Sequence, residues 1–252
     1  MRATAAAGRQ RRRRPLTSRR ALVIKTGEAL PSLVAERGNY EEWIIRGLGL
    51  PRESVDVAAV FEGDPLPDPS LVSGVVITGS SAMVTERALW SERTGAWLVG
   101  VVESDLPVLG ICYGHQLIAD TMGGRVEKNP RGREIGTIDV LLRAEASDDR
   151  LFSGLPANLR VHATHVESVV ELPSGTRCLG TSDGDPHQVL AFGENVWGTQ
   201  FHPEFDAEVV RRYIGSRRET LIEEGLDADV LYENASDSPH GDTILRRFGA
   251  FL

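Results

Sequence analysis

Short apolar runs alternate with amphipathic segments along the first half of the chain. Runs of β-branched and other apolar residues predict buried strands at 21–26, 55–60, 74–78 and 107–111. Between them, an Asn39 cap predicts a short helix, and apolar residues near helical spacing predict another over 88–103. Parallel neighbours need crossover connections, so this alternation predicts a three-layer α/β fold, with helices on both faces of a mostly parallel central sheet.

The second half of the chain has a different pattern. Short β-rich segments separated by turn residues predict antiparallel ribbons at the sheet edge, at 136–142, 159–172, 177–181, 188–192 and 196–201. An amphipathic helix follows Asp206 and ends near Gly225. We therefore expect one domain over 21–225, followed by a helical or mobile extension over 226–252.

The composition is that of a globular protein. Apolar residues are 41% and charged residues 25% of the 252, which excludes disorder of the whole chain. No window approaches the roughly 20 apolar residues of a membrane helix, so no membrane association is expected. Two cysteines, Cys112 and Cys178, cannot form a disulfide framework, and the cytoplasm is the expected compartment.

Charge is distributed unevenly along the chain. The formal net charge is −8, but the first 20 residues contain eight arginines and no acid, so the other 232 carry −16. An acidic body repels phosphate backbones, and we expect no specific nucleic-acid partner. Residues 1–20 have almost no large apolar side chains and are expected to form a basic, disordered tail. Arg19-Arg20 resembles the start of an export signal, but the apolar run after it ends too early, at Lys25.

The sharpest chemical feature surrounds Cys112. A predicted buried strand runs into a predicted helix there, and glycines stand two residues to either side, Gly110 and Gly114. This is the nucleophile-elbow layout, in which glycines relieve crowding at a sharp strand-to-helix turn. The positive end of a helix dipole favours the thiolate form of a cysteine at this position. Cys112 is therefore the candidate nucleophile, whereas Cys178 is expected to lie in the core.

A second feature, His202-Pro203-Glu204, directly follows an apolar strand. Pro203 excludes a helix, so His202 and Glu204 can point to the same side of extended backbone. A thiolate that attacks a carbonyl needs an imidazole to protonate the leaving group, and the imidazole needs an acceptor on its other nitrogen. We therefore predict that Cys112, His202 and Glu204 form a catalytic triad.

A third feature is the glycine turn after the strand at 74–78. Attack on an amide creates a negatively charged oxygen, which fixed hydrogen-bond donors stabilise. The backbone N–H groups of Ser80 and of Tyr113, directly after the nucleophile, are the candidate oxyanion hole. Gly79 would permit the tight turn.

Other candidate sites have less support. His162 and His165 lie three residues apart on a strand-like run with no cysteine nearby, so we expect packed histidines and no metal site. The chain contains no glycine-rich phosphate loop of the P-loop type. We therefore expect no cofactor, and ATP use by this chain is not supported.

Together these stretches resemble the class I glutamine amidotransferases, through Gly-x-Cys-x-Gly-x-Gln around Cys112 and the downstream His-Pro-Glu. The resemblance covers about 21–225 and is greatest to free-standing glutaminase domains of the GMP-synthetase type. It implies hydrolysis of glutamine to glutamate and ammonia through a thioester on Cys112. It also implies substrate contacts at Gly79 and Gln116, and a synthetase partner that accepts the ammonia.

Two departures from the family pattern leave other functions open. Thr164-His165-Val166-Glu167 stands where relatives often have Ser-His-Gly-Asp, and Ser81 stands where many have Pro. Both changes lie where substrate is expected, so a hydrolase of γ-glutamyl peptides or other γ-glutamyl amides with the same triad is an alternative. A regulatory protein that is inactive, permanently or until a synthetase docks, is a further alternative.

Overall fold

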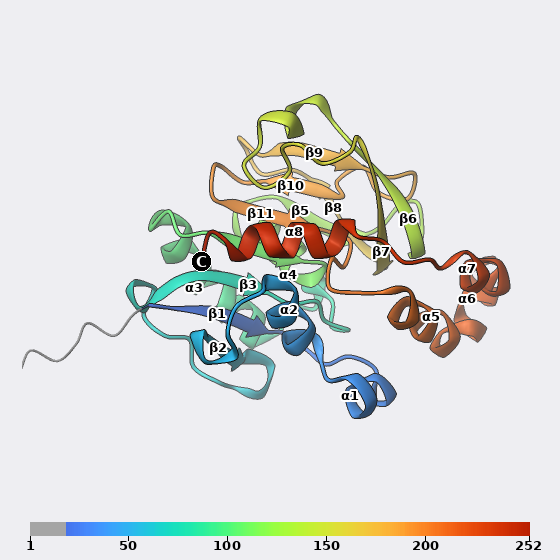
Figure 1. Cartoon of the computed structure of the whole chain (residues 1–252), viewed down its shortest axis with the longest axis horizontal. Coiled ribbons are helices and arrows are strands. Elements are labelled where there is room, and N and C mark those ends of the chain that lie inside the picture. The colour runs from blue at the N-terminus through green and yellow to red at the C-terminus, as the bar shows by residue number, and fades with distance from the viewer. Residues whose placement is uncertain (1–18) are drawn as a thin grey trace, which may run out of the picture.

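The computed structural model describes residues 19–252, and one large sheet runs through the middle of it (Figure 1). Its nine strands have the order β2-β1-β3-β4-β11-β10-β9-β6-β7. They are β1 (Arg20–Lys25), β2 (Val55–Ala59), β3 (Val72–Ile77), β4 (Val108–Ile111), β6 (Glu134–Leu142), β7 (Asn158–His165), β9 (Arg177–Thr181), β10 (Val189–Ala191) and β11 (Val196–Thr199). The predicted disordered tail comprises residues 1–20, and residues 1–18 of it lie outside the described range.

Helices cover both faces of the sheet, as the alternation of strand and helix signals predicts. They are α1 (Pro31–Arg37), α2 (Tyr40–Leu48), α3 (Leu89–Glu103), α4 (Tyr113–Thr121), α5 (Ala207–Ser216), α6 (Arg218–Glu223), α7 (Ala228–Asn234) and α8 (His240–Gly249). The predicted Asn39 cap is present: its side chain and that of Glu42 form a capping box at the start of α2.

The alternation of side chains along β1 explains the three layers. Ala21 and Val23 belong to the apolar cluster that contains α2 and α8, whereas Leu22 and Ile24 belong to the cluster that contains α3 and α4. Successive strand residues point to opposite faces, so an uninterrupted apolar run is buried on both sides. This confirms the predicted three-layer α/β architecture.

The parallel part of the sheet is larger than the sequence pattern predicts. Strands β2, β1, β3, β4 and β11 are all mutually parallel. The expectation that 196–201 forms an antiparallel edge ribbon is therefore wrong in part. Strand β11 lies inside the sheet, where it pairs parallel with β4 and antiparallel with β10. The tight connection at 192–195 reverses the chain after β10 and returns β11 to the direction of β4.

The segment 159–172 forms two strands in different sheets. β7 pairs with β6 in the large sheet, whereas β8 (Glu167–Glu171) pairs with β5 (Arg125–Lys128) in a separate two-stranded ribbon. The chain leaves one sheet for the other at Val166, and this crossing brings residues 164–167 beside the end of β4. The predicted antiparallel ribbons are otherwise present among β6, β7, β9 and β10.

The segment after residue 225 is helical, and its last helix is built into the fold. Ile244, Leu245 and Phe248 of α8 are fully buried and belong to the same apolar cluster as α2 and β1. They lie at positions i, i+1 and i+4, which form one face of a helix. Figure 1 shows α8 lying across the sheet above α2. Helix α8 thus packs against the same apolar cluster as α2 and β1.

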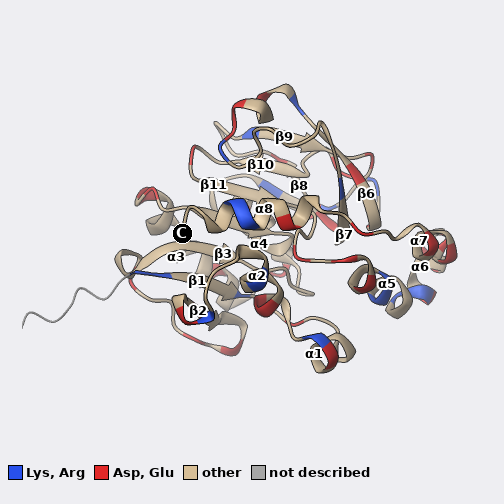
Figure 2. Cartoon of the chain, in the orientation of Figure 1, with Lys and Arg blue, Asp and Glu red and all other residues tan. Residues whose placement is uncertain are grey.

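Charged residues of both signs are interspersed over the helices and loops around the sheet (Figure 2). Within residues 19–252, no helix combines the length and the apolar character that crossing a bilayer requires.

Candidate active site

Cys112 occupies the corner between β4 and α4 in a strained backbone conformation. Its φ of 49° and ψ of −96° lie in a region that residues with a side chain rarely adopt. A β-carbon on Gly110 would lie 2.5 Å from the backbone of Gly114, and one on Gly114 would lie 2.6 Å from the carbonyl oxygen of Ile77. The two glycines therefore allow strand and helix to meet at this sharp turn, with Cys112 at the helix N-terminus.

His202 and Glu204 form a buried hydrogen-bonded pair after β11. Nδ1 of His202 lies 2.7 Å from Oε1 of Glu204, and both side chains are almost fully buried. The backbone N–H of His202 donates to the carbonyl of His162 at 2.8 Å, which fixes the segment against β7. The Phe205 ring stacks on the imidazole with the ring centroids 4.0 Å apart. The His202 ring is thus held in one orientation by its neighbours.

The surroundings of His202 favour its protonated form. Burial by itself lowers the pKa of this imidazole, but the Glu204 carboxylate and the sulfur of Cys112, through charge and hydrogen bonding, raise it by more. The net result is a pKa of about 10. An imidazole with this pKa carries a proton at neutral pH, which is the form that can protonate a departing amine.

The turn after β3 presents a free backbone donor. The hydroxyls of Thr26 and Thr78 donate to the carbonyl oxygen of Gly79 at 3.0 and 2.9 Å. Because a trans peptide directs its C=O and N–H in opposite directions, the N–H of Ser80 points away from these threonines. Within residues 19–252, the backbone N–H groups of Ser80 and Tyr113 donate no hydrogen bond. Both residues line the same cavity as Cys112, so the expected oxyanion donors lie beside the sulfur.

Two adjoining cavities meet at these residues. Cys112 and Gln116 line a cavity of about 60 Å³, and His202 lines a second one of about 180 Å³. The residues that line both cavities are Ser80, Ser81, Thr164 and Arg217. The Cys112 thiol is also a hydrogen-bond partner of His202, so the structure brings the predicted triad and oxyanion residues together where the two cavities adjoin.

The two expected substrate contacts have different environments. Gln116 is buried, and its amide nitrogen donates to the carbonyl of Glu167 at 2.8 Å and to Oε1 of Gln200 at 3.0 Å. Its side chain lines the cavity with Cys112. Gly79 lines neither cavity; a β-carbon there would lie 2.7 Å from Cε1 of His202. Gly79 therefore makes room for the imidazole.

The segment that departs from the family pattern has a supporting role. The ring of His165 is buried, with Nε2 2.9 Å from Oε2 of Glu134. The Glu167 carboxylate accepts a hydrogen bond from the backbone of Val84 at 3.0 Å and another from the Thr85 hydroxyl. Both side chains are thus occupied by protein partners. Within residues 19–252, no three His, Cys, Asp or Glu side chains are grouped to hold a metal ion.

Sequence reasoning did not identify Arg217, which lines both cavities. A signal was present: Arg217 lies four residues after Tyr213 and continues the apolar face of α5 formed by Val209, Val210, Tyr213 and Ile214. A charged residue on a buried helix face indicates a functional contact or a buried ion pair. At the end of this buried face of α5, Arg217 lines both cavities of the site.

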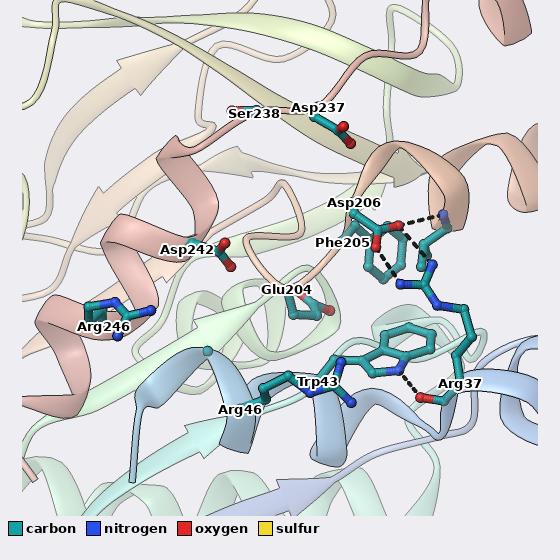
Figure 3. Close-up of a pocket in the computed structure, with 12 residues that line it drawn as sticks. Arg37, Trp43, Arg46, Glu204, Phe205, Asp206, Asp237, Ser238, Asp242 and Arg246 are labelled. Carbon is teal, nitrogen blue, oxygen red and sulfur yellow. Dashed lines mark hydrogen bonds and ion pairs between the residues drawn. The ribbon is translucent and has the colours of Figure 1, made fainter.

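A larger cavity, of about 390 Å³, lies close by, but no cysteine or histidine lines it (Figure 3). Trp43 and Arg46 of α2, Arg246 of α8, and Glu204 are among the residues that line it. Neither Cys112 nor His202 does so. The largest of these three cavities is therefore not one that contains the candidate nucleophile or the imidazole of His202.

Comparison with known proteins defines the class of this site. The family model for glutamine amidotransferase class-I matches residues 43–214, which is more than half of the chain. The chain therefore belongs to the class I glutamine amidotransferase family.

The relatives carry the names of different enzymes. One relative, a subunit of the glutamine-hydrolyzing GMP synthase of Archaeoglobus fulgidus, is 33% identical over 186 residues, covering 70% of this chain and 92% of that one. Gamma-glutamyl peptidase 4 from Arabidopsis thaliana is 29% identical over 177 residues, 69% of this chain and 70% of that one. Two further GMP synthases are matched over 32% and 23% of their own lengths.

A solved structure supports the fold assignment. The glutamine amidotransferase of Thermotoga maritima superposes with a TM-score of 0.72 and 25% sequence identity. The match covers 91% of this chain and 96% of the other. The three-layer fold described above is thus that of the family.

Proposed function

We propose that this protein hydrolyses the γ-amide of glutamine to glutamate and ammonia, with Cys112 as the nucleophile. The observation that carries this proposal is the contact of Cys112, at a strained helix N-terminus, with His202 of the buried His202–Glu204 pair. A thiol, an imidazole and a carboxylate in this order are the parts that nucleophilic hydrolysis of an amide requires.

Each group has a defined part in the proposed reaction. The Cys112 thiolate attacks the γ-carbonyl carbon, and the N–H groups of Ser80 and Tyr113 stabilise the oxyanion that forms. Protonated His202 then donates its proton to the departing nitrogen, which leaves as ammonia and leaves a γ-glutamyl thioester on the sulfur. Neutral His202 next takes a proton from water, which attacks the thioester and releases glutamate. Glu204 holds the ring and stabilises its charged form throughout.

Gln116 is the proposed contact for the amino-acid end of the substrate. Both hydrogen bonds of its amide nitrogen are made to protein groups, so its amide oxygen is the polar atom available to a ligand. An oxygen acceptor beside the thiol cavity suits the α-ammonium group of glutamine.

A partner enzyme is the second part of the proposal. The chain has no P-loop sequence, whereas a relative that it covers almost completely is named as a subunit of a synthase. We therefore propose that a synthetase-type partner accepts the ammonia. If activity depends on that partner, glutamate release by the pure protein rises when the partner is added.

Glutamate release from glutamine tests this function. The purified protein is expected to release glutamate and ammonia in equal amounts, alone or after addition of extract from the source cells. Cys112→Ala abolishes release under both conditions, and Cys178→Ala is the matched control that leaves it unchanged, because Cys178 lies outside both cavities. Undiminished release by Cys112→Ala would refute the proposal.

A further inference from the structure

Arg217 places a partly buried positive charge beside the proposed catalytic groups. Its guanidinium lies 4.8 Å from the centroid of the Tyr213 ring, and its Nη1 atom is buried without a hydrogen-bond partner. Within residues 19–252, no carboxylate lies within ion-pair distance of it. Burial lowers the pKa of Arg217, since the charged form loses its hydration. A buried charge without a partner is costly, which suggests a role in ligand binding.

The other charged groups at the two cavities already have protein partners, either an opposite charge or hydrogen-bond donors. Arg133, which lines the cavity with Cys112, forms an ion pair with Glu224 at 2.7 Å. Glu28, which lines the cavity with His202, lies 3.3 Å from the Lys25 ammonium group. Arg217 is thus the cation there that has no counter-ion among the described residues, and an anionic ligand group would supply one.

A second unpartnered polar atom lies at the same junction. The hydroxyl oxygen of Thr164 is buried and has no hydrogen-bond partner within residues 19–252. Its backbone carbonyl lies 4.0 Å from the Cys112 sulfur. Thr164 and Arg217 both line the two cavities, so a ligand at the sulfur passes close to both.

The space beside His202 is larger than ammonia requires. That cavity has a volume of about 180 Å³, whereas a molecule the size of water or ammonia occupies roughly 30 Å³. The leaving nitrogen must face His202, because this group protonates it. The cavity is therefore on the leaving-group side and has room for an amine the size of a small amino acid.

We infer that the protein also hydrolyses γ-glutamyl amides whose leaving group is an α-amino acid, and that Arg217 binds the carboxylate of that leaving group. This inference rests on the proposed function, since it uses the same nucleophile. The bond between the γ-carbon and the amide nitrogen breaks as sulfur bonds to that carbon, and His202 donates the proton to the nitrogen. Water then cleaves the thioester, so the products are glutamate and the free amino acid. Arg217 is a specificity residue, because the reacting atoms lie at Cys112 and His202.

Two substrates that differ in one carboxylate test the inference. γ-Glutamylglycine and γ-glutamylethylamide have leaving groups of similar size, and glutamate release reports both. In the wild-type protein, kcat/KM for γ-glutamylglycine is expected to exceed that for the ethylamide by roughly 10- to 100-fold, the value of one charge-assisted hydrogen-bonded contact. Arg217→Met removes this preference and leaves the ethylamide rate within about threefold. Arg217→Lys retains part of it, because the charge is kept.

A neighbouring arginine supplies the matched control. Arg218 forms an exposed ion pair with Asp229 at 2.6 Å and lines neither cavity of the site, so Arg218→Met should preserve the preference. Equal losses on glutamine, the ethylamide and γ-glutamylglycine in Arg217→Met would overturn the inference, because Arg217 would then bind the α-carboxylate of the glutamyl unit. Wild-type hydrolysis of glutamine without a preference for γ-glutamylglycine would also overturn it, with the proposed function intact.

Binding measurements separate failure of the inference from failure of the proposed function. Calorimetry on Cys112→Ala should detect tighter binding of γ-glutamylglycine than of the ethylamide, and the additional Arg217→Met change should abolish this difference. If γ-glutamylglycine binds more tightly but the wild-type protein hydrolyses no substrate, the proposed function is contradicted and the assignment of Arg217 as a carboxylate contact stands. Absence of both binding preference and turnover would overturn both.

Discussion

A β-carbon on Gly79 would lie 2.7 Å from Cε1 of His202, so the oxyanion turn and the imidazole fit together because residue 79 has no side chain. Such a contact is shorter than carbon atoms tolerate, and one of the two groups would have to move. The relationship joins two parts of the proposed machinery that lie more than 120 positions apart in the chain. The need for space beside the His202 ring explains why residue 79 is a glycine, without any contact between Gly79 and substrate.

Gly79→Ala is therefore expected to impair turnover more than folding. Displacement of the His202 ring by a few tenths of an ångström to 1 Å should lower kcat on the order of 100-fold, with a smaller effect on KM. Gly215→Ala is the control, since the added carbon of that helical glycine would meet no atoms within 4 Å beyond its chain neighbours and its own helix backbone. Steady-state kinetics on both variants check the prediction, and full activity of Gly79→Ala would contradict the described fit.

The hydroxyl of Thr26 is expected to position the oxyanion donor. It contacts the carbonyl and hydroxyl of Thr78 and the carbonyl of Gly79, each at 3.0 Å. Thr26→Val leaves these buried groups with one partner fewer, which should cost about 1–3 kcal/mol of unfolding free energy. It should also lower kcat roughly 10-fold at nearly constant KM, because the Gly79–Ser80 peptide loses part of its support.

Thr243→Val separates this positioning effect from the general loss of a hydroxyl. Thr243 donates to the carbonyl of Pro239 in an exposed turn of α8. Its replacement should leave kcat unchanged. If Thr26→Val reduces stability and leaves kcat at the wild-type value, Thr26 has no part in placing the Ser80 N–H group.

His115 is expected to make the fold sensitive to acid. It is fully buried, and burial lowers its pKa from 6.5 to about 3. Below pH 6.5 the unfolded chain binds a proton that the folded state excludes, so stability falls as pH decreases towards 3. His115→Leu should remove on the order of 2 kcal/mol of the stability lost between pH 7 and pH 5. Urea unfolding at the two pH values measures this, and an identical pH dependence in both proteins would contradict it.

Phe248→Ala tests whether α8 belongs to the domain. Phe248 is fully buried and packs edge-on against Trp197 of β11, with the ring centroids 6.1 Å apart. Its truncation should cost about 3–5 kcal/mol of unfolding free energy. Leu141→Ala is the control, because Leu141 is 60% exposed and should change stability by less than about 0.5 kcal/mol. A stability loss from Phe248→Ala no larger than that of the control would indicate that α8 is an appendage.

Features set by neighbouring residues could be predicted from the sequence. Strands β1 and β4 and most of β3 read as apolar runs because they are buried on both faces. The turn at Cys112 could be predicted because the two glycines that permit it lie within two residues. His202 and Glu204 could be paired because an intervening proline excludes a helix.

Features that depend on distant partners could not be predicted in the same way. The direction of β11 depends on its pairing with β4, some 90 residues earlier, and a four-residue strand gives no local sign of it. The apolar face of α8 is short, and its partners on α2 lie almost 200 residues away. Arg217 could not be identified from the sequence for the same reason. Its lack of a counter-ion depends on which residues surround it in the folded site.

Labelling with a glutamine analogue that carries an electrophile at the γ-carbon tests the central claim most directly. Peptide mass spectrometry should locate a single adduct on Cys112, with Cys178 unmodified, and an excess of glutamine should prevent its formation. The adduct should also be at least 10-fold slower to form in His202→Gln, whose side chain cannot hold the charge of the thiolate. Equal modification of the two cysteines, or labelling of Cys112 that glutamine does not slow, would contradict the assignment of Cys112 as the nucleophile of a γ-glutamyl site.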